Sequence, residues 1–421
     1  MKKEFSLPRG MKDIEPEEFL RRSYVYGKIE NVLKRYGFQF VEPSALENFE
    51  TLSAKSGPAI EKEIYVFKDK SDRKIALRFD LTVGMARMVA SKKWPKPIKL
   101  ACISNMWRYD RPQYARYRSF YQWDIEIFGS DNQEADAEII AVICDILDSF
   151  SLDYEIRISN RKLVEGFVIG LGVSEKKAPS VLRIIDKMAK ISKKELEEYL
   201  GKSMKKEQID KLLLFCQKAN DLKYVEKNIP NNELAKKGAE ELKNLFSLLR
   251  KLGKWEKCSV DLSIVRGIDY YTGIVFEAWL KEEELGAVAG GGRFDDLTKI
   301  YGEEMGAVGV AGGIERLLLA LEKKTLDTEK IPKIQVIFVS DSTFEKALEI
   351  LQKLRKFTSA DMDLNKRNIR KQMDYANARN VPYVIFVGEK ELAEGKVKLK
   401  NMATGNEKMI DIDKLEDLGN L

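Results

Sequence analysis

The feature that most restricts the fold is a pair of long strand-like stretches, at about 99–110 and 117–129, joined by the short segment RPQYAR. In the second stretch, YRSFYQWDIEIFG, the odd positions from 121 to 127 are Tyr, Trp, Ile and Ile, and the even positions are mostly polar. Alternate residues of a strand share one face, so this strand has one apolar face and one polar face. The pair therefore predicts neighbouring strands of a sheet that buries one face in a core.

The polar face of this strand pair carries a row of hydrogen-bonding side chains, Gln122, Asp124 and Glu126. The partner stretch adds Arg108 and Asp110 on a shared parity. Arginine binds phosphate and carboxylate groups through two parallel hydrogen bonds, and carboxylates bind cations and N–H donors. The row therefore suggests a site for a zwitterion together with a phosphate. The alternative is the solvated face of a half-exposed sheet.

A second strand-like region, SIVRGIDYYTGIVFEAW at 263–279, is interrupted by polar residues. A charge in an apolar run is unfavourable unless it is paired or faces a ligand. Arg266 and Tyr271 differ in parity, so one straight strand cannot present both side chains to one site. We therefore expect a strand end, a turn through RGIDY and a new strand from about Tyr271, so that both side chains face the same site.

The rest of the chain alternates helical and strand-like segments. Residues 17–36 and the stretch EADAEIIAVICDILDSF have apolar residues at helical spacing. The segment 161–254 is rich in lysine, glutamate and leucine, and it predicts a helical insertion because strand-like sequence resumes at CSVDLSIV. Beyond a linker-like segment near residue 330, strands and helices alternate as in a small α/β domain.

Glycine-rich segments occur at 286–293 and 306–313, and Arg316 lies just inside the helix that follows the second one. Small residues on a strand allow a flat ring to approach the backbone. The alternative interpretation is tight packing between that strand and the helix.

Composition excludes several classes of chemistry. The 421 residues include no histidine, which removes Ser-His-Asp and Cys-His catalysis and histidine metal ligands. The four cysteines are scattered without a CxxC pair, which suits a reducing cytoplasm and gives no reason to assign a metal site. No apolar stretch is long enough to span a membrane. A net charge of +6 permits a nucleic-acid partner without requiring one.

Two basic segments are candidates for nucleic-acid contact. The loop between the paired strands contains Arg111, Gln113 and Arg116, and NKRNIRKQ near the C-terminus contains Arg367 and Arg370. Side chains of these kinds contact nucleic-acid phosphates. A surface loop with incidental arginines and a solvated helix face are the alternatives.

These segments together resemble the class II aminoacyl-tRNA synthetases. WRYDRPQYARYRSFYQWDIEIFG resembles motif 2 of that class, the spacing of GAVGVAGGIERLLLA at 306–320 resembles motif 3, and Pro43 fits the motif 1 proline of the dimer interface. VRGIDYYTGIVFEA resembles the signature of histidyl-tRNA synthetases, with companion segments in LRFDLTVGMAR, NRKLVEG and GGGRFDDL. The resemblance covers nearly the whole chain and is weak only over 165–255.

The resemblance implies an α+β fold with a class II catalytic domain built on a mostly antiparallel sheet, a helical insertion and a C-terminal α/β anticodon-binding domain. The expected catalytic domain comprises 1–160, with motifs 1 and 2, and 255–325, with the histidine-specific segment and motif 3. The insertion is expected at 161–254 and the anticodon-binding domain at 331–421.

The resemblance also implies roles in ATP binding and catalysis. Arg108 matches the motif 2 arginine that binds the α-phosphate, and Arg316 matches the motif 3 arginine on the γ-phosphate side. Arg266 resembles the family's catalytic arginine, which reaches the substrate carboxylate and the α-phosphate. Asp110 and Arg116 complete the expected ATP-binding set.

A further set of residues matches the family's histidine-binding positions: Asp80, Thr82, Gln122, Glu126, Arg266, Tyr270 and Tyr271. The first three match positions that hold the α-amino group. Glu126 and Tyr271 match those that read the two imidazole nitrogens.

Several positions depart from the family pattern. Phe294 stands where a tyrosine is usual, and Gly84 stands where a proline is usual. Trp123 replaces a smaller residue and Gly312 a bulkier one, while Asp80 is shorter than the glutamate of some relatives. The loss of the tyrosine hydroxyl removes one polar contact expected near the imidazole.

The implied protein is a homodimeric, cytoplasmic enzyme without a membrane anchor that charges tRNA(His) with L-histidine, using ATP and Mg²⁺. One alternative is a synthetase-like regulatory subunit that binds histidine without aminoacylating tRNA, but such subunits tend to lose the catalytic arginine and the C-terminal domain. A nucleotide-binding structural protein is the other alternative, and it leaves residues 330–421 unexplained.

Overall fold

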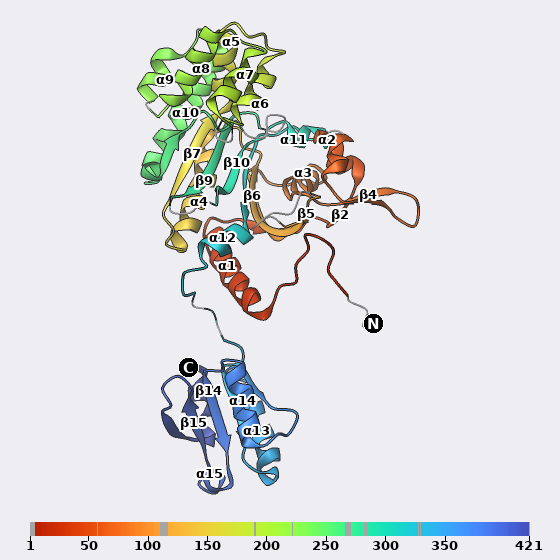
Figure 1. Cartoon of the computed structure of the whole chain (residues 1–421), viewed down its shortest axis with the longest axis vertical. Coiled ribbons are helices and arrows are strands. Elements are labelled where there is room, and N and C mark those ends of the chain that lie inside the picture. The colour runs from red at the N-terminus through yellow and green to blue at the C-terminus, as the bar shows by residue number, and fades with distance from the viewer. Residues whose placement is uncertain are drawn as a thin grey trace. The chain divides into compact units, whose positions relative to one another are not determined.

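The computed structural model describes the chain in two units. The described residues are 5–56, 58–109, 117–188, 191–220, 222–265, 271–281, 285–326, 328 and 330–420. Contacts between residues divide the chain into Met1–Leu326 and Asp327–Leu421 (Figure 1). None of the helices in the described residues is both long and apolar enough to cross a membrane. The four-part division into domains stays a prediction.

The described part of the first unit contains an eight-stranded sheet. In spatial order its strands are β1 (Gln39–Phe40), β5 (Ile98–Trp107), β6 (Ser119–Phe128), β11 (Ala307–Gly313), β10 (Ala287–Arg293), β9 (Ile274–Leu280), β7 (Tyr154–Asn160) and β8 (Cys258–Val260). The outer pairs β1–β5 and β7–β8 are parallel, and the pairs between them are antiparallel. The predicted α+β fold on a mostly antiparallel sheet is therefore confirmed.

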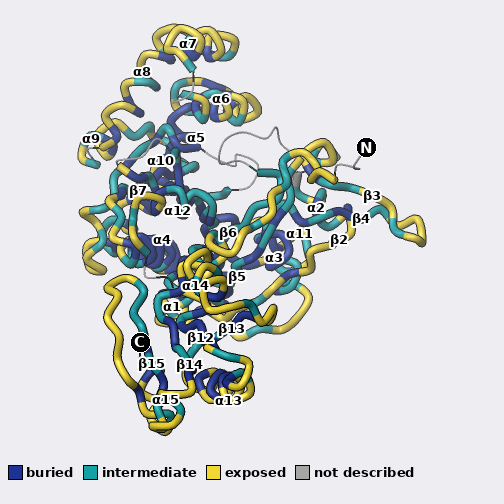
Figure 2. Tube along the Cα trace, turned by 60° about the horizontal axis from the view of Figure 1, so that its bottom comes forward, coloured by how far each residue is buried: buried dark blue, intermediate teal, exposed yellow. Residues whose placement is uncertain are grey.

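One face of this sheet is covered by three helices, α1 (Pro16–Arg35), α4 (Gln133–Ser149) and α12 (Ile314–Ala320). The apolar residues of α1 recur at helical spacing, and Val25 and Ile29 are fully buried. They share a core with the odd positions of β6, and most of α4 is drawn as buried in Figure 2. Gly37 follows α1 with a φ of +75°, a left-handed conformation that glycine commonly adopts just after the end of a helix.

The other face is covered near the sheet centre by α3 (Thr82–Ala90) and the short α11 (Leu297–Ile300). Leu81, Met85, Leu100 and Phe294 form an apolar cluster there. A three-stranded sheet in the order β2 (Leu46–Asn48), β4 (Lys74–Leu77), β3 (Val66–Lys68) adjoins α2 (Phe49–Ser56) and a 3₁₀ turn at Pro58–Lys62. The segments EIYVFK and KIALRF thus contribute the two antiparallel strands of a hairpin, β3 and β4.

The segment GFQFVEPSALEN forms two short strands, β1 and β2, and the chain breaks between them at Pro43, since proline cannot donate a ladder hydrogen bond. The alternative of a solvated polar face on β6 is wrong, because Asp124 and Glu126 are each 1% exposed. Both faces of this strand are buried where α3 and its neighbours cover the sheet.

The segment after β7 is helical, as predicted. It contains α5 (Arg161–Gly170), α6 (Ala178–Ile185), α7 (Lys193–Gly201), α8 (Lys206–Gln217), α9 (Leu222–Asn228) and α10 (Glu233–Lys251), followed by a 3₁₀ turn at Trp255–Lys257. Asn160 caps α5 by accepting a hydrogen bond from the backbone N–H of Leu163. Residues of these helices continue the core of the main sheet, and α10 packs along α5 (Figure 1).

The second unit is a small α/β domain with its own core. Its described elements are β12 (Ile334–Phe338), a 3₁₀ turn (Asp341–Thr343), α13 (Phe344–Leu354), β13 (Ala360–Met362), α14 (Ile369–Ala378), β14 (Tyr383–Val387), α15 (Glu389–Ala393), β15 (Lys396–Asn401), β16 (Glu407–Asp411) and a final 3₁₀ segment (Ile412–Asn420). The strand order is β13-β12-β14-β15-β16, parallel at the first two pairs and antiparallel at the last two. The predicted alternation of strand and helix is confirmed.

Candidate active site

The polar row of β6 lies between two neighbouring strands of the main sheet. Gln122, Asp124 and Glu126 pair on one side with Ser104, Cys102 and Leu100 of β5 and on the other with Gly313, Ala311 and Gly309 of β11. The β11 partners are small. A Cβ added to Gly309 would collide with the Glu126 carboxylate, so glycine at this position makes room for that carboxylate.

Glu126 is held by a residue from the helix that covers the site. The Thr82 hydroxyl, at the start of α3, donates to Glu126 Oε1 at 2.6 Å. Among the described residues, Glu126 Oε2 is buried and has no hydrogen-bond partner. Burial raises the pKa of Glu126 well above its ordinary value, and the nearby charges of Asp124 and Asp80 act in the same direction. The free oxygen is an acceptor available for a ligand N–H group.

Asp80 lies at the start of α3 and is partly engaged there. Its Oδ1 accepts a hydrogen bond from the Val83 backbone N–H at 3.1 Å. Burial raises the pKa of Asp80, and the positive charge of Arg108 opposes that rise. The structure thus brings Asp80, Thr82 and Glu126 to one place, although they come from segments about 40 residues apart.

Arg108 and Gln122 lie toward the other end of the row. Arg108 Nε donates to the Phe79 carbonyl at 2.9 Å, and its guanidinium lies over the Phe120 ring, 5.2 Å from the centroid. Gln122 Oε1 is buried and, within the described part of the chain, accepts no hydrogen bond. The row therefore has an arginine toward one end and a carboxylate at the other.

Tyr271 approaches the site from the segment before β9. Its ring packs against the cluster that contains Met85 and Phe294, and a Cβ on Gly292 would lie only 2.9 Å from Tyr271 Cδ1. The strand begins at Ile274 rather than at about Tyr271, so Tyr271 precedes the ladder. Arg161 Nη1 donates to the Tyr271 carbonyl at 2.6 Å and fixes this backbone.

Phe294, at the position where a tyrosine is usual in the family, lies wholly inside the apolar cluster. It is buried and meets Phe128 edge to face with the ring centroids 6.1 Å apart. An aromatic ring in this position contributes packing that does not need a hydroxyl.

Arg316 is the third residue of α12, which directly follows β11. Its Nη1 donates to the Ala287 carbonyl at the start of β10. The preceding residue, Glu315, accepts from the Tyr121 backbone N–H at 3.1 Å and pairs with the buried Arg22 at 3.1 Å. These contacts join α12 to β6, β10 and α1 and fix the place of Arg316 in the sheet layer.

Several residues named from the sequence lie outside the described residues: Asp110, Arg111, Gln113, Arg116, Arg266 and Tyr270. Of the two C-terminal arginines, Arg367 binds the buried Asp363, with Nε 2.7 Å from Oδ2 and Nη2 3.1 Å from Oδ1. Arg370, in the first turn of α14, is exposed.

Sequence reasoning missed two residues that shape the site, and it placed Asp124 in the polar row without a role of its own. Arg161 was quoted only as part of a family segment. Arg78, which is buried, donates to the Pro43 carbonyl and the Ser104 hydroxyl at 2.5 Å each. An arginine inside the apolar run KIALRF was the signal that could have revealed it.

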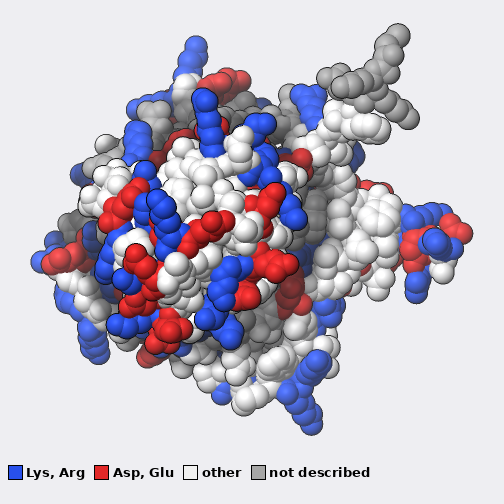
Figure 3. All heavy atoms as spheres, turned by 90° about the horizontal axis from the view of Figure 1, so that it is seen from below, with Lys and Arg blue, Asp and Glu red and all other residues white. Residues whose placement is uncertain are grey.

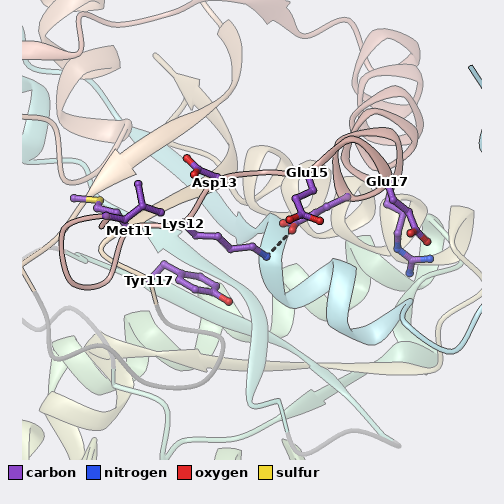
Figure 4. A pocket seen from close by; sticks show the side chains of 9 residues that line it. Met11, Lys12, Asp13, Glu15, Glu17 and Tyr117 are labelled. Carbon is purple, nitrogen blue, oxygen red and sulfur yellow. Dashed lines mark ion pairs between the residues drawn. The ribbon is translucent and has the colours of Figure 1, made fainter. Parts of the chain in front are cut away.

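A separate open cavity of about 770 Å³ lies beside the end of the N-terminal segment (Figure 4). Its lining residues are Leu7, Met11, Lys12, Asp13, Glu15, Glu17, Glu18, Arg21 and Tyr117. Lys12 pairs with Glu18 at 2.5 Å and lies 5.5 Å from the Tyr117 ring centroid. This cavity contains none of the residues of the polar row.

The comparisons with protein families match both units of the chain. The model of histidyl-tRNA synthetase matches residues 10–317, and the model of the anticodon binding domain matches residues 333–418. The histidine–tRNA ligase of Pyrococcus abyssi is 38% identical over 96% of each of the two chains.

Solved structures agree with this assignment. The crystal structure of histidyl-tRNA synthetase from Nostoc sp. PCC 7120 matches with a TM-score of 0.87 and 29% identity over 100% of both chains. An ATP phosphoribosyltransferase regulatory subunit/histidyl-tRNA synthetase from Bacillus halodurans C matches with a TM-score of 0.79 at 22% identity, over 91% of this chain and 98% of that one, which shows a shared fold. From the family model and the full-length relative, we conclude that the chain belongs to the histidyl-tRNA synthetase family.

Proposed function

We propose that the protein is a histidine–tRNA ligase, which activates L-histidine with ATP to histidyl-adenylate and transfers histidine to tRNA(His), releasing AMP and diphosphate. The observation that carries the proposal is the buried Glu126, which is oriented by Thr82 and keeps one oxygen unpartnered among the described residues, within a chain that matches this family along its length.

The ring of histidine is read at Glu126 and Tyr271. Glu126 Oε2 accepts the N–H of the neutral imidazole, and the Tyr271 hydroxyl pairs with the other ring nitrogen. An amino acid without an N–H group at this place would leave the buried carboxylate unpaired. Sites built around buried polar groups reject such analogues strongly. The raised pKa of Glu126 supports this role, since an ionised carboxylate is unfavourable there without a donor.

The α-amino group of histidine is held by Asp80, Thr82 and Gln122. Tyr270, which adjoins Tyr271 in the sequence, is a further histidine-binding residue in this proposal. Thr82 donates its proton to Glu126, so its oxygen remains available as an acceptor. The substrate carboxylate is directed toward Arg266 and Arg108. This arrangement places the amino acid along the polar row.

The activation step needs charge neutralisation rather than a base. The substrate carboxylate is already ionised when it attacks the α-phosphorus of ATP, and negative charge develops on the phosphate oxygens. Fixed guanidinium groups of Arg108 and Arg266 stabilise that charge, and Arg316 binds the γ-phosphate side. Asp110 and Arg116 help to position ATP. A chain without histidine can therefore perform this chemistry.

Mg²⁺ accompanies ATP in this proposal and would neutralise part of the phosphate charge. The ion usually keeps several water ligands and is bound by one or two carboxylates together with substrate phosphates. Such binding does not need a dedicated protein cage. Among the described residues, no three acidic or cysteine side chains form a group that could hold a metal ion.

The transfer step brings tRNA(His) to the adenylate. A phosphate oxygen of the adenylate can accept the proton of the attacking ribose hydroxyl. Arg111 and Gln113 of the motif 2 loop contact the tRNA, and the C-terminal unit binds the anticodon through Arg367 and Arg370. The match of residues 333–418 to an anticodon binding domain supports this part of the proposal.

The active form is a homodimer in the cytoplasm. The motif 1 resemblance at Pro43 supports the dimer, and Arg78 holds the Pro43 carbonyl from within the subunit. The homodimer and the cytoplasmic location both stay predictions. The regulatory-subunit alternative is disfavoured because Arg108, Arg266 and Arg316 are present together with the C-terminal domain.

ATP–pyrophosphate exchange against all twenty amino acids tests the proposed function. We expect exchange with histidine alone, and exchange with no amino acid or with a different one would overturn the assignment. Replacing Arg266→Ala should lower exchange by roughly 100- to 1,000-fold, since one stabiliser of transition-state charge is lost. Arg73→Ala, in the exposed turn between β3 and β4, is the control and should exchange at the unmodified rate.

A further inference from the structure

Asp124 lies on the same face of β6 as Gln122 and Glu126, midway between them. Residues two apart on a strand are separated by roughly 6–7 Å, so the row from Gln122 to Glu126 spans roughly 13 Å. A ligand whose amino group is bound near Gln122 and whose ring is bound at Glu126 therefore lies across Asp124. The cross-strand neighbour of Asp124 on β11 is the small Ala311.

The Asp124 carboxylate is buried without a donor. It is 1% exposed, and within the described part of the chain neither of its oxygens accepts a hydrogen bond. Asp136, an equally buried carboxylate of the same unit, is bound by Arg293 at 2.8 Å. A buried ionised group without a partner is strongly unfavourable. Asp124 therefore has the character of an acceptor that a ligand completes.

The acceptors around Asp124 match the donors of an ammonium group. An ammonium group has three N–H donors. Asp80 offers only part of its carboxylate, because Oδ1 already accepts from the Val83 backbone N–H, and Gln122 offers the unpartnered Oε1. Asp124 adds a further acceptor, and unlike Gln122 and the Thr82 hydroxyl it carries a negative charge when ionised. The shorter Asp80, where some relatives have glutamate, is thereby complemented by a second acid.

Electrostatics favours the same ligand group. Burial raises the pKa of Asp124 well above its ordinary value, the charge of Asp80 raises it further, and Arg108 and Arg78 oppose the rise. Two neighbouring carboxylates that resist ionisation together are stabilised when a cation lies between them. The α-ammonium group of an amino acid is such a cation.

We propose that the Asp124 carboxylate accepts a hydrogen bond from the α-ammonium group of histidine and is a further specificity-determining residue of this site. The inference rests on the proposed binding of histidine along Gln122 and Glu126. It goes beyond the residues that the family resemblance implies, because Asp124 is not among them.

The test compares histidine with imidazole-4-propionate, which has the same ring and carboxylate but no amino group. Binding of both to the full chain and to Asp124→Asn is measured by calorimetry, and the KM values for histidine and ATP are measured in the exchange assay. We expect Asp124→Asn to weaken histidine binding roughly 10- to 100-fold, since a hydrogen bond to a charged partner is lost. The binding of imidazole-4-propionate should not weaken, and the KM for ATP should not rise.

Glu126→Gln is the matched control within the same row. This substitution alters the contact with the imidazole ring, so it should weaken the binding of both histidine and imidazole-4-propionate. Asp72→Asn, in an exposed turn, should leave the binding of both ligands unchanged. If the unmodified chain does not bind histidine, the proposed function fails. If the unmodified chain binds histidine and Asp124→Asn binds it equally well, only the inference fails.

Three further outcomes would overturn the role of Asp124. If Asp124→Asn weakened the binding of histidine and of imidazole-4-propionate equally, Asp124 would not distinguish the amino group. A raised KM for ATP with an unchanged KM for histidine would mean that Asp124 orients Arg108 instead. A lower melting temperature of ligand-free Asp124→Asn would show a loss of stability, and it would mean that Asp124 is already paired in the empty protein. We expect that melting temperature to be unchanged or higher.

Discussion

At the scale of single residues, the indole of Trp123 fills the space that Gly312 leaves on the neighbouring strand. The two residues are cross-strand partners in β6 and β11, and a Cβ on Gly312 would collide with the indole ring. The family pattern has a smaller residue at the first position and a bulkier one at the second. The two departures are therefore one exchange of volume between adjacent strands, which keeps the core filled.

Adding a methyl group at Gly312 tests this exchange. Gly312→Ala should destabilise the first unit by roughly 1–3 kcal/mol, because the rigid indole has no room to move. In the double variant with Trp123→Leu, the added methyl should cost much less, so the two changes should be strongly non-additive in thermal unfolding. Gly27→Ala, in the open middle of α1, is the control and should stabilise by roughly 0.5–1 kcal/mol. Additive effects of Gly312→Ala and Trp123→Leu on stability would contradict the exchange of volume between the two strands.

At the scale of elements, the start of α5 holds the segment that contains Tyr271, which we propose reads the imidazole ring of histidine. Arg161 follows β7 directly, its backbone N–H donates to the Gly273 carbonyl at 2.9 Å, and its side chain donates to the Tyr271 carbonyl. On the other side, Thr272 donates to Asp295 at 2.6 Å. Tyr271, Thr272 and Gly273 are thus held by contacts from α5 and from the segment after β10, although they precede the first residue of β9.

Arg161→Gln removes the side-chain bond to this segment. We expect the KM for histidine in the exchange assay to rise roughly tenfold while the KM for ATP changes little, because the bond positions Tyr271, the residue proposed to read the ring. Arg161→Lys should raise the KM for histidine less than Arg161→Gln does, since lysine keeps a hydrogen-bond donor. Arg157→Gln, in the adjoining strand β7 and paired with Glu155, is the control and should leave both KM values unchanged. An equal rise in both KM values would indicate a general structural role.

At the scale of the whole molecule, the two units match different family models, one of histidyl-tRNA synthetase and one of an anticodon binding domain. On the face shown in Figure 3, lysine and arginine side chains are interspersed with acidic ones, as the small net charge of +6 would suggest. Specific arginines therefore matter more than overall charge. Arg367 is engaged by the buried Asp363, and this contact lowers the pKa of that carboxyl, whereas Arg370 is exposed at the start of α14.

The two arginines should respond differently to replacement by alanine. Arg370→Ala should weaken tRNA binding and reduce its salt dependence by about one counterion, with no change in ATP–pyrophosphate exchange. Arg367→Ala should also lower the thermal stability of the C-terminal unit, because Asp363 is left buried without its partner. Lys414→Ala, in the last 3₁₀ segment, is the control for loss of one charge. Unchanged tRNA affinity in Arg370→Ala would exclude it from the interface.

Much of the architecture could be predicted because it depends on local periodicity. The strands β5 and β6, the helices α1 and α4, the helical segment after β7 and the alternating C-terminal unit all follow from the spacing of apolar residues. The polar row was visible for the same reason, since alternation along one strand sets which side chains share a face. The family motifs then associated these segments with one chemistry.

The sequence by itself determined the secondary elements, the members of the polar row and the absence of histidine chemistry. Only the tertiary structure decided that the row is buried, that Thr82 orients Glu126, that Arg161 holds Tyr271 and that Trp123 and Gly312 exchange volume. These contacts join residues that are far apart along the chain and depend on sheet register. Burial and pairing are properties of neighbours in space, and periodicity along a single strand carries no information about them.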